Sequence, residues 1–332
     1  MRKKYMNAFS QKSIYGQVYK TILAHGLVKK GDRVIVALSG GPDSMALFSI
    51  LRELGEKLSM EIIVCHFNHR LRGEASDQDE QFVIKKCHEF GVECIVGRAD
   101  RKNRYKSENT AREARYSFFE KILEEGRGES IAIAHNQNDQ AETVLMRLIR
   151  GTGIRGLKSI PYKRQKFIRP LLDIPREEIE TFLKNEKIPF VVDQSNLSCD
   201  YQRNEIRAHL LPYLTTINPN ILETLTNISK SASMDYDFIE QNSVKAMNYI
   251  MLESHQDKIY FDYKKWLNLH PTLQVMVLRL GLETLASLDD ISVTQIEEVV
   301  SVLKKGVGKK YKRLPHSLII ELNDGKIVLS KQ

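Results

Sequence analysis

The segment Ser39-Gly40-Gly41-Pro42-Asp43-Ser44 separates two stretches of different hydrophobic pattern. The stretch before it, 34–38, is entirely apolar, which is typical of a strand buried on both faces. The stretch after it, 45–54, has the apolar spacing of a helix, and Pro42 suits the first helical position. The two glycines let backbone N–H groups approach a ligand, and the exposed start of a helix favours an anion. The segment therefore predicts a strand, a glycine turn and a helix that together bind phosphate.

This loop differs from the P-loop of the Walker-type ATPases, which carries a lysine that reaches the β and γ phosphates. Asp43 stands in the loop instead, and a carboxylate beside a polyphosphate repels it unless Mg²⁺ lies between the two. We therefore predict an ATP site in which residues 39–44 surround the phosphates and Asp43 is a Mg²⁺ ligand. The same residues also fit a structural role, in which Asp43 caps the helix and the glycines turn the chain.

The length of 332 residues exceeds the usual size of one domain, so we expect two domains. No stretch of 18 apolar residues occurs, and no apolar segment follows the basic N-terminus, so we expect a cytoplasmic protein without a membrane partner. The four cysteines have neither a C-x-x-C pair nor a metal-ligand spacing, which predicts reduced thiols. They are Cys65, Cys87, Cys94 and Cys199.

Strand-like and helix-like patterns alternate through the first 215 residues, which predicts an α/β fold with a doubly wound parallel sheet. The expected strands are 33–38, 61–67, 92–96, 130–134 and 167–169. The expected helices are 42–57, 76–90, 109–125, 140–150 and 175–187. After the break at Pro212 the pattern becomes helical and ends in strand-like runs at 317–322 and 326–330. We therefore predict domains at 15–215 and 216–332, the second smaller and mainly helical with a short β tail.

Ligands of a doubly wound sheet bind beyond the carboxyl ends of its strands, so the residues after each strand are candidates for the site. His135 and Asp139 follow the strand at 130–134 and are candidate catalytic residues. Asp139 also has the spacing of a helix capping box with Glu142, so a structural role stays open. The pair His66 and His69 follows the strand at 61–67, but no third ligand has a suitable spacing for zinc. This segment is better explained as a loop that lines the nucleotide pocket.

Two pairs of arginines stand at helical spacing: Arg112 with Arg115, and Arg203 with Arg207. Such pairs can clamp phosphates, and we predict contacts to phosphate or to a nucleic acid. The same spacing fits surface salt bridges to Glu113 or Glu205, and spacing alone does not decide between the two.

The net charge of +8 is concentrated in three basic clusters, at 98–106, 147–169 and 304–313. Each cluster alone fits a solvated surface, whereas the three together favour a polyanion larger than ATP. We therefore expect a nucleic-acid partner.

The loop at 39–44 resembles the PP-loop of the N-type ATP pyrophosphatases, which cleave ATP between the α and β phosphates. Further motifs, together with this loop, resemble the tRNA(Ile)-lysidine synthetases, one family of that group, over about residues 30–215. These motifs are 66–74, 109–116, 139–143 with 150–153, and 203–207.

The resemblance implies ligation of free L-lysine to C2 of the wobble cytidine of tRNA(Ile) with a CAU anticodon, which changes decoding from AUG to AUA. The cytidine is first adenylated by ATP, and the lysine amine then displaces AMP. Family roles carried over make Asp43 the Mg²⁺ ligand and His135 and Asp139 active-site residues. They make Arg112 and Arg203 or Arg207 contacts to phosphates or the adenylate. Many members carry a second His and a second Asp where this chain has Asn136 and Asn138, which weakens any role for those two positions.

The resemblance also implies that region 216–332 binds tRNA, and no protein partner is evident. Two other functions remain open at this stage. A tRNA thiolase would use the same adenylate with a sulfur nucleophile, but the chain has no plausible pair of active-site cysteines. A non-catalytic ATP-dependent RNA-binding module is the second alternative.

Overall fold

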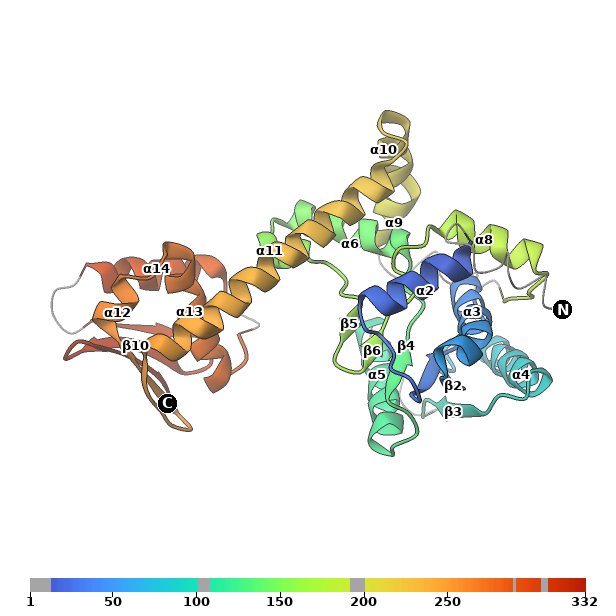
Figure 1. Ribbon diagram of the computed structural model, residues 1–332, viewed down its shortest axis with the longest axis horizontal. Helices are drawn as coiled ribbons and strands as arrows, with labels where there is room; N and C mark the ends of the chain where they lie inside the picture. Colours follow the sequence, from blue (N-terminus) through green and yellow to red (C-terminus); the bar gives the residue numbers. More distant parts are fainter. Residues whose placement is uncertain (1–12, 101–107, 192–200, 289–290, 306–309) are drawn as a thin grey trace. The chain divides into compact units, whose positions relative to one another are not determined.

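The computed structural model describes residues 13–100, 108–191, 201–288, 291–305 and 310–332. The chain forms two compact units, Met1–Ala232 and Ser233–Gln332, each with its own hydrophobic core (Figure 1). The helix α11, Ile221–Ile250, runs through the boundary between them.

The N-terminal unit contains a six-stranded sheet with the order β3-β2-β1-β4-β6-β5. All neighbouring strands are parallel except the pair β5 and β6. Chain order reverses between β1 and β4, which makes the carboxyl ends of these two strands the place where a ligand is expected. The strands are β1 (Arg33–Ala37), β2 (Glu61–Asn68), β3 (Cys94–Arg98), β4 (Ser130–Ala132), β5 (Lys163–Arg164) and β6 (Phe167–Ile168).

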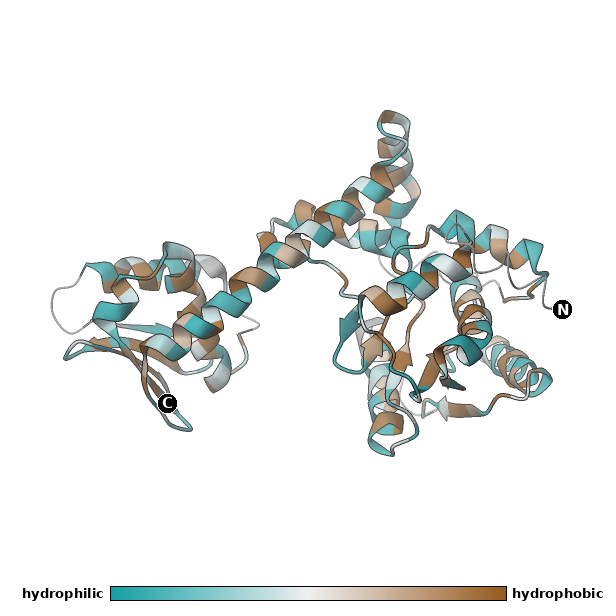
Figure 2. Cartoon of the chain, in the orientation of Figure 1, coloured by the Kyte–Doolittle hydropathy of each residue, from teal (hydrophilic) through white to brown (hydrophobic). Residues whose placement is uncertain are grey.

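Successive residues of β1 face opposite sides of the sheet, and both sides are buried. Val34 and Val36 belong to one core with residues of α2, α3, α4 and α8, whereas Ile35 belongs to a second core with residues of α5. Helices therefore cover both faces, which confirms the predicted doubly wound α/β fold. Figure 2 shows the strands as mainly hydrophobic and the helices as two-sided.

The five predicted helices of this unit are present, and the described residues contain five further helical segments outside the predicted ranges. Together they are α2 (Ile14–Ala24), α3 (Pro42–Leu58), α4 (Glu74–Glu89), α5 (Glu108–Glu124), α6 (Gln137–Arg150), α7 (Ile154–Leu157), α8 (Arg176–Asn185), α9 (Tyr201–Glu205), the π-helix η2 (Ile206–Leu210) and α10 (Leu211–Ile217). The helix α2 had not been predicted, and it buries Val18 and Ile22 completely. The strand β5 had not been predicted either, because two residues show no alternation.

Pro212 does not end the helical region, because it lies in the first turn of α10, where its missing N–H is not needed. The face of α6 that carries Val144 and Leu145 packs on Ile206 and Leu211, and Leu225 of α11 joins the same cluster. The start of α11 thus belongs to the N-terminal unit. The compact units consequently divide at 232/233, whereas we placed the boundary at 215/216.

The C-terminal unit combines α12 (Tyr263–Leu267), α13 (Pro271–Leu285) and α14 (Val293–Lys304) with a five-stranded antiparallel sheet of order β7-β8-β11-β10-β9. The predicted strand-like runs are β10 (Leu318–Asn323) and β11 (Lys326–Lys331). The β part is larger than the predicted tail, because these strands pair with β7 (Met251–Ser254), β8 (Lys258–Asp262) and β9 (Lys310–Leu314). Trp266 is fully buried at the centre of this core.

The thiols of Cys65, Cys87 and Cys94 are free, and the first two are buried. Cys199 lies outside the described residues. Across the described part of the chain, every helix is too short or too polar to cross a lipid bilayer.

Candidate active site

The loop between β1 and α3 forms the glycine turn and helix start that the sequence predicts. Gly40 adopts a φ of +91°, a conformation that L side chains rarely adopt, and Gly41 forms the N-cap of α3 without a side-chain hydrogen bond. Ser44 holds the turn closed, because its hydroxyl accepts a hydrogen bond from the Ser39 N–H at 3.2 Å and donates one to the Gly41 carbonyl at 3.0 Å. The start of the helix therefore lacks a side-chain cap, and Asp43 does not cap it.

A cavity of about 510 Å³ opens beside this loop at the carboxyl ends of the strands. The loop residues on its wall are Ser39, Gly41, Pro42, Asp43 and Ser44, and other elements contribute His66, His69, Arg115, Tyr116, His135, Arg176 and Arg207. Four predicted site residues are absent from the described lining: Gly40, Arg112, Asp139 and Arg203. Arg176 had not been predicted as a site residue, because it follows Pro175 at the start of α8 and belongs to no motif.

Asp43 is half-buried beside the cavity, and its Oδ1 atom is buried without a hydrogen-bond partner. Burial raises the pKa of Asp43, and the nearby Asp139 carboxylate raises it further. An orphaned carboxylate oxygen at a phosphate-binding loop fits a Mg²⁺ ligand, because Mg²⁺ is bound by one or two carboxylates together with substrate phosphates. In the described residues no group of three or more His, Cys, Asp or Glu side chains could hold a metal by itself.

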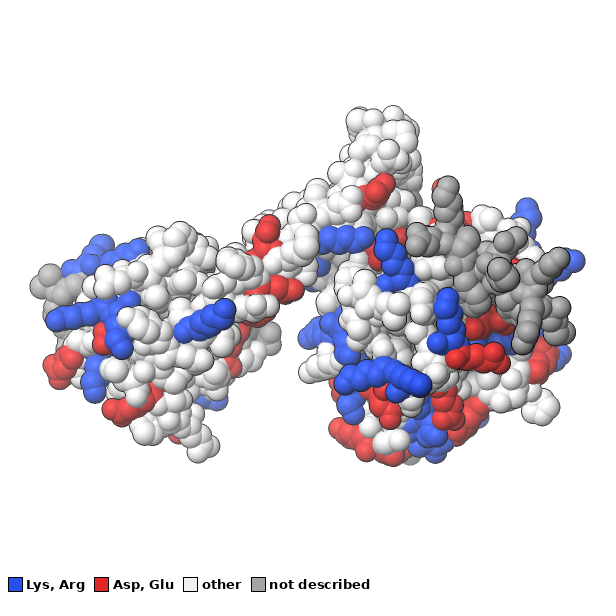
Figure 3. All heavy atoms as spheres, viewed as in Figure 1, with Lys and Arg blue, Asp and Glu red and all other residues white. Residues whose placement is uncertain are grey.

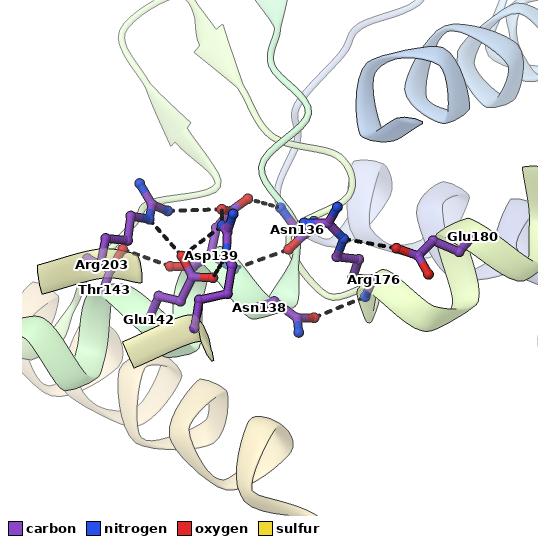
Figure 4. A network of polar contacts seen from close by, with 9 residues as sticks. Asn136, Asn138, Asp139, Glu142, Thr143, Arg176, Glu180 and Arg203 are labelled. Atoms are coloured by element: carbon purple, nitrogen blue, oxygen red, sulfur yellow. Dashed lines mark hydrogen bonds and ion pairs between the residues drawn. The ribbon is translucent and has the colours of Figure 1, made fainter. Parts of the chain in front are cut away.

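Asp139 takes part in two sets of contacts at the start of α6 (Figure 4). Its Oδ2 accepts a hydrogen bond from the Asn136 N–H at 3.0 Å, and Asn136 Oδ1 accepts one from the Asp139 N–H at 3.1 Å. The capping box is therefore formed with Asn136 and not with Glu142. The other oxygen, Oδ1, accepts a hydrogen bond from Arg203 at 2.9 Å.

The arginine pair of α9 and η2 binds acidic residues of α6. The Nε atoms of Arg203 and Arg207 each lie 2.6 Å from a carboxylate oxygen of Glu142, whose side chain is only 1% exposed. Arg207 also lies 3.6 Å from Asp139. The pair had been expected to bind phosphate or a neighbour such as Glu205, and the partner Glu142 was missed because it lies more than 60 residues away in sequence.

The two asparagines that depart from the family pattern have structural contacts. Asn136 caps α6, and Asn138 accepts a hydrogen bond from the Arg176 N–H at 3.0 Å, which joins α6 to α8 (Figure 4).

The two arginines of α5 differ in their position relative to the cavity. Arg115 lines the cavity, and its charge lowers the pKa of His69 after the larger effect of burial. Arg112 is exposed, with its guanidinium 5.2 Å from the centroid of the Tyr116 ring. Of this pair, only Arg115 therefore lies on the cavity wall.

His66 and His135 enter the cavity from β2 and from the end of β4. His66 Nδ1 lies 2.8 Å from the carbonyl oxygen of Leu38, and His135 Nδ1 accepts a hydrogen bond from Arg169 Nε at 3.1 Å. Burial lowers the pKa of His135 to about 3, and the charges of Arg169 and of other arginines contribute. Both rings therefore line the cavity as neutral imidazoles near neutral pH, since burial lowers the pKa of His66 as well.

The half-buried histidines His69 and His135 predict a loss of stability in mild acid. The pKa is about 4 for His69 and about 3 for His135, against an unfolded value of about 6.5. Between these values the unfolded chain binds more protons, so the free energy of unfolding falls as pH falls from 6.5 towards 4. Urea denaturation should show that the free energy of unfolding falls less between pH 7.5 and pH 5.0 in His69→Gln than in the wild type. A variant of the exposed His255, His255→Gln, should lose as much as the wild type, and equal losses in all three proteins would contradict the assignment.

Comparison with known proteins places this site in a family. A family model described as "PP-loop domain" matches residues 10–214. The tRNA(Ile)-lysidine synthase of Clostridium acetobutylicum is 35% identical over 94% of this chain and 69% of its own length, and that of Clostridioides difficile is 33% identical over 96% and 71%. The synthase of Pseudothermotoga lettingae is 42% identical over 65% of this chain and 49% of its own length.

Among solved structures, the U34-tRNA thiolase NcsA from Methanococcus maripaludis matches with a TM-score of 0.56 and 20% identity. The match covers 66% of this chain and 78% of that protein, and it shows a shared fold. The relatives from Clostridium acetobutylicum and Clostridioides difficile carry the same description, and the PP-loop match to residues 10–214 of this chain contains the sheet and the cavity described above. This chain therefore belongs to the tRNA(Ile)-lysidine synthase family of PP-loop proteins.

Proposed function

We propose that this protein uses ATP to attach lysine to C2 of the wobble cytidine of tRNA(Ile) with a CAU anticodon, giving lysidine, AMP and pyrophosphate. The observation that carries the proposal is the single cavity shared by the PP-loop, Asp43, His135, Arg115 and Arg207 in a chain of this family. The volume of about 510 Å³ lies within the range of roughly 300–1,000 Å³ that is typical of small-molecule sites.

The reaction takes place in two displacements. In the first, the O2 atom of cytosine attacks the α phosphorus of ATP, and pyrophosphate leaves. In the second, the ε-amine of lysine attacks C2, the bond from C2 to O2 breaks, and AMP leaves with that oxygen. The target base lies in a single-stranded anticodon loop, so little energy is needed to bring it into a pocket.

In the first step, the residues of the cavity stabilise negative charge at different places. The backbone N–H groups of Gly40, Asp43 and Ser44, in the loop and at the start of α3, bind phosphate oxygens. The guanidinium groups of Arg115 and Arg207 stabilise the charge that develops on the departing pyrophosphate. Asp43 would hold Mg²⁺, which when bound would neutralise charge on the phosphates and on the leaving group.

The second step needs an acceptor for a proton, because free lysine has an amine pKa of about 10.4 and must lose a proton to attack. We assign Asp139 as the acceptor of this proton. Its carboxylate is close enough to Asp43, beside the cavity, to raise the pKa of that residue, and it accepts a hydrogen bond from Arg203. If the variant Asp139→Asn transferred lysine from a preformed adenylate at the wild-type rate, this assignment would be wrong.

The direct test is a reaction of the purified protein with ATP, Mg²⁺, lysine and unmodified tRNA(Ile), followed by mass spectrometry of nucleosides. A cytidine heavier by lysine minus water, formed with one AMP per product, would support the proposal. Release of AMP without this product would point to another nucleophile, and no AMP would argue for a binding module.

The basic surface of the C-terminal unit is proposed to bind the tRNA backbone. Lys304, Lys305 and Arg313 are exposed there, and Figure 3 shows Lys and Arg side chains on the visible face of this unit. Their replacement by Ala should raise the KM for tRNA about tenfold and weaken its salt dependence, with the KM for ATP unchanged. Three exposed lysines outside the clusters, Lys20, Lys30 and Lys121, provide the control triple variant. A raised KM for ATP with an unchanged KM for tRNA would refute the proposal.

A further inference from the structure

We propose that Arg169 is a positioning residue that holds His135 in the neutral tautomer with its proton on Nε2. His135 then acts as a hydrogen-bond donor to an oxygen of the substrates and not as a base. The donor role of His135 in the reaction rests on the proposed function above, whereas the assignment of its tautomer does not.

The tautomer follows from the contact between the two side chains. Arg169 Nε lies 3.1 Å from His135 Nδ1, and a guanidinium group only donates hydrogen bonds. His135 Nδ1 must therefore carry a lone pair. A neutral imidazole has one proton, which then resides on Nε2, at the opposite edge of the ring.

Arg169 is itself held in place, so the donor is fixed before any substrate binds. The residue follows β6 directly and is only 5% exposed. Its backbone N–H donates to the Tyr162 carbonyl at 2.9 Å, and its Nη1 donates to the Pro161 carbonyl at 2.9 Å. These two hydrogen bonds fix the backbone of Arg169 and one end of its guanidinium group. The Nε atom can therefore point to His135 at little further cost in conformational entropy.

The charges around His135 act in the same direction. Burial lowers the pKa of His135 to about 3, and the charges of nearby arginines lower it in the same direction: Arg169, Arg112, Arg203 and Arg115. A base that must accept a proton near neutral pH needs a pKa near the working pH. His135 is far from this condition, whereas its N–H is available as a donor over the whole neutral range.

His66 provides the opposite case in the same cavity. Its Nδ1 lies 2.8 Å from the Leu38 carbonyl, which only accepts, so Nδ1 carries the proton and Nε2 has the lone pair. Both histidines line the cavity. The contacts of the two Nδ1 atoms thus make His135 a hydrogen-bond donor at Nε2 and His66 a hydrogen-bond acceptor at Nε2.

The tautomer can be measured directly by ¹⁵N NMR of the imidazole rings in the full-length protein. In the wild type at pH 7 we expect His135 Nδ1 to give the shift of an unprotonated nitrogen and Nε2 that of a protonated one. In Arg169→Met both nitrogens should move towards averaged shifts, while the control Arg127→Met, a change at an exposed arginine paired with Glu93, should leave them unchanged. Protonated Nδ1 in the wild type would overturn the proposal, even if the variant did not fold.

Kinetic measurements distinguish whether His135 acts as a hydrogen-bond donor or as a base. A glutamine amide can replace an Nε2–H donor but cannot take up a proton, so His135→Gln should keep a kcat at least tenfold above that of His135→Ala. Arg169→Met should lower kcat about 100-fold, because a displaced donor no longer meets the reacting oxygen. A raised KM for ATP in His135→Ala would identify a phosphate oxygen as the acceptor, and a raised KM for tRNA would identify cytosine. Equal kcat values for His135→Gln and His135→Ala would overturn the donor role.

The two proposals fail in different ways. A wild-type protein that makes no lysidine would refute the proposed function, while the NMR shifts would still decide the tautomer of His135.

Discussion

The variant Asp43→Asn should lose at least about 1,000-fold in the rate of AMP release while it remains folded. The carboxylate stands in the phosphate-binding loop, its Oδ1 is buried without a partner, and an amide cannot supply the negative charge that a Mg²⁺ ion requires. The measurement is single-turnover release of AMP with saturating ATP, lysine and tRNA.

The same variant should be at least as stable as the wild type in the absence of ATP and Mg²⁺. The pKa of Asp43 is raised in the folded protein, so ionisation of this group costs stability at every pH above its unfolded value, and removal of the charge removes that cost. Thermal unfolding at pH 7 measures this effect. Such a result would mean that Asp43 lowers stability in favour of function, as is common at active sites.

The control for Asp43→Asn is Asp324→Asn in the turn between β10 and β11. Asp324 has a φ of +47°, a conformation that asparagine tolerates, so this variant should keep both its stability and its activity. Full activity of Asp43→Asn, or loss of its fold, would contradict the role assigned to this carboxylate.

The variant Glu142→Gln should be destabilised by about 3 kcal/mol, near the lower end of the range for a broken buried ion pair. Glu142 is almost completely buried and binds both Arg203 and Arg207 at 2.6 Å. Without its charge, the two guanidinium groups lose their main buried partner. The arginines keep some access to water, with side chains 28% and 42% exposed, which limits the effect.

Activity should fall together with stability in Glu142→Gln, because Arg207 lines the cavity and its direction depends on Glu142. Urea denaturation and the rate of AMP release measure the two effects. The exposed Glu120 of α5 provides the control variant Glu120→Gln, which should change stability by less than about 0.5 kcal/mol.

A double-mutant cycle tests whether the contact itself is responsible. The variant Glu142→Gln/Arg203→Gln should be less destabilised than the sum of the single changes, because each single change leaves a charge unpaired. Strictly additive effects would show that Glu142 and Arg203 do not interact in solution.

The elements that the sequence predicts well are those with a local signal. The strands at 33–38 and 61–67 are runs of apolar residues, and the helix after the PP-loop has a clear periodicity, so both were placed within a few residues. The sheet of the C-terminal unit was underestimated, because β7, β8 and β9 are short and become strands through pairing with β10 and β11.

The amino-acid sequence by itself determined the sheet, the phosphate-binding loop and the residues that follow each strand, because these depend on patterns within a few neighbouring positions. It also identified Asp43, His135, Asp139 and the arginine pairs as candidates. The tertiary structure decided which charges meet: His135 meets Arg169, 34 residues away, and Glu142 meets Arg207, 65 residues away. Such contacts depend on how distant segments pack, and a local pattern does not contain that information. For the same reason, only the folded chain shows the contact with Arg169 from which we infer the tautomer of His135.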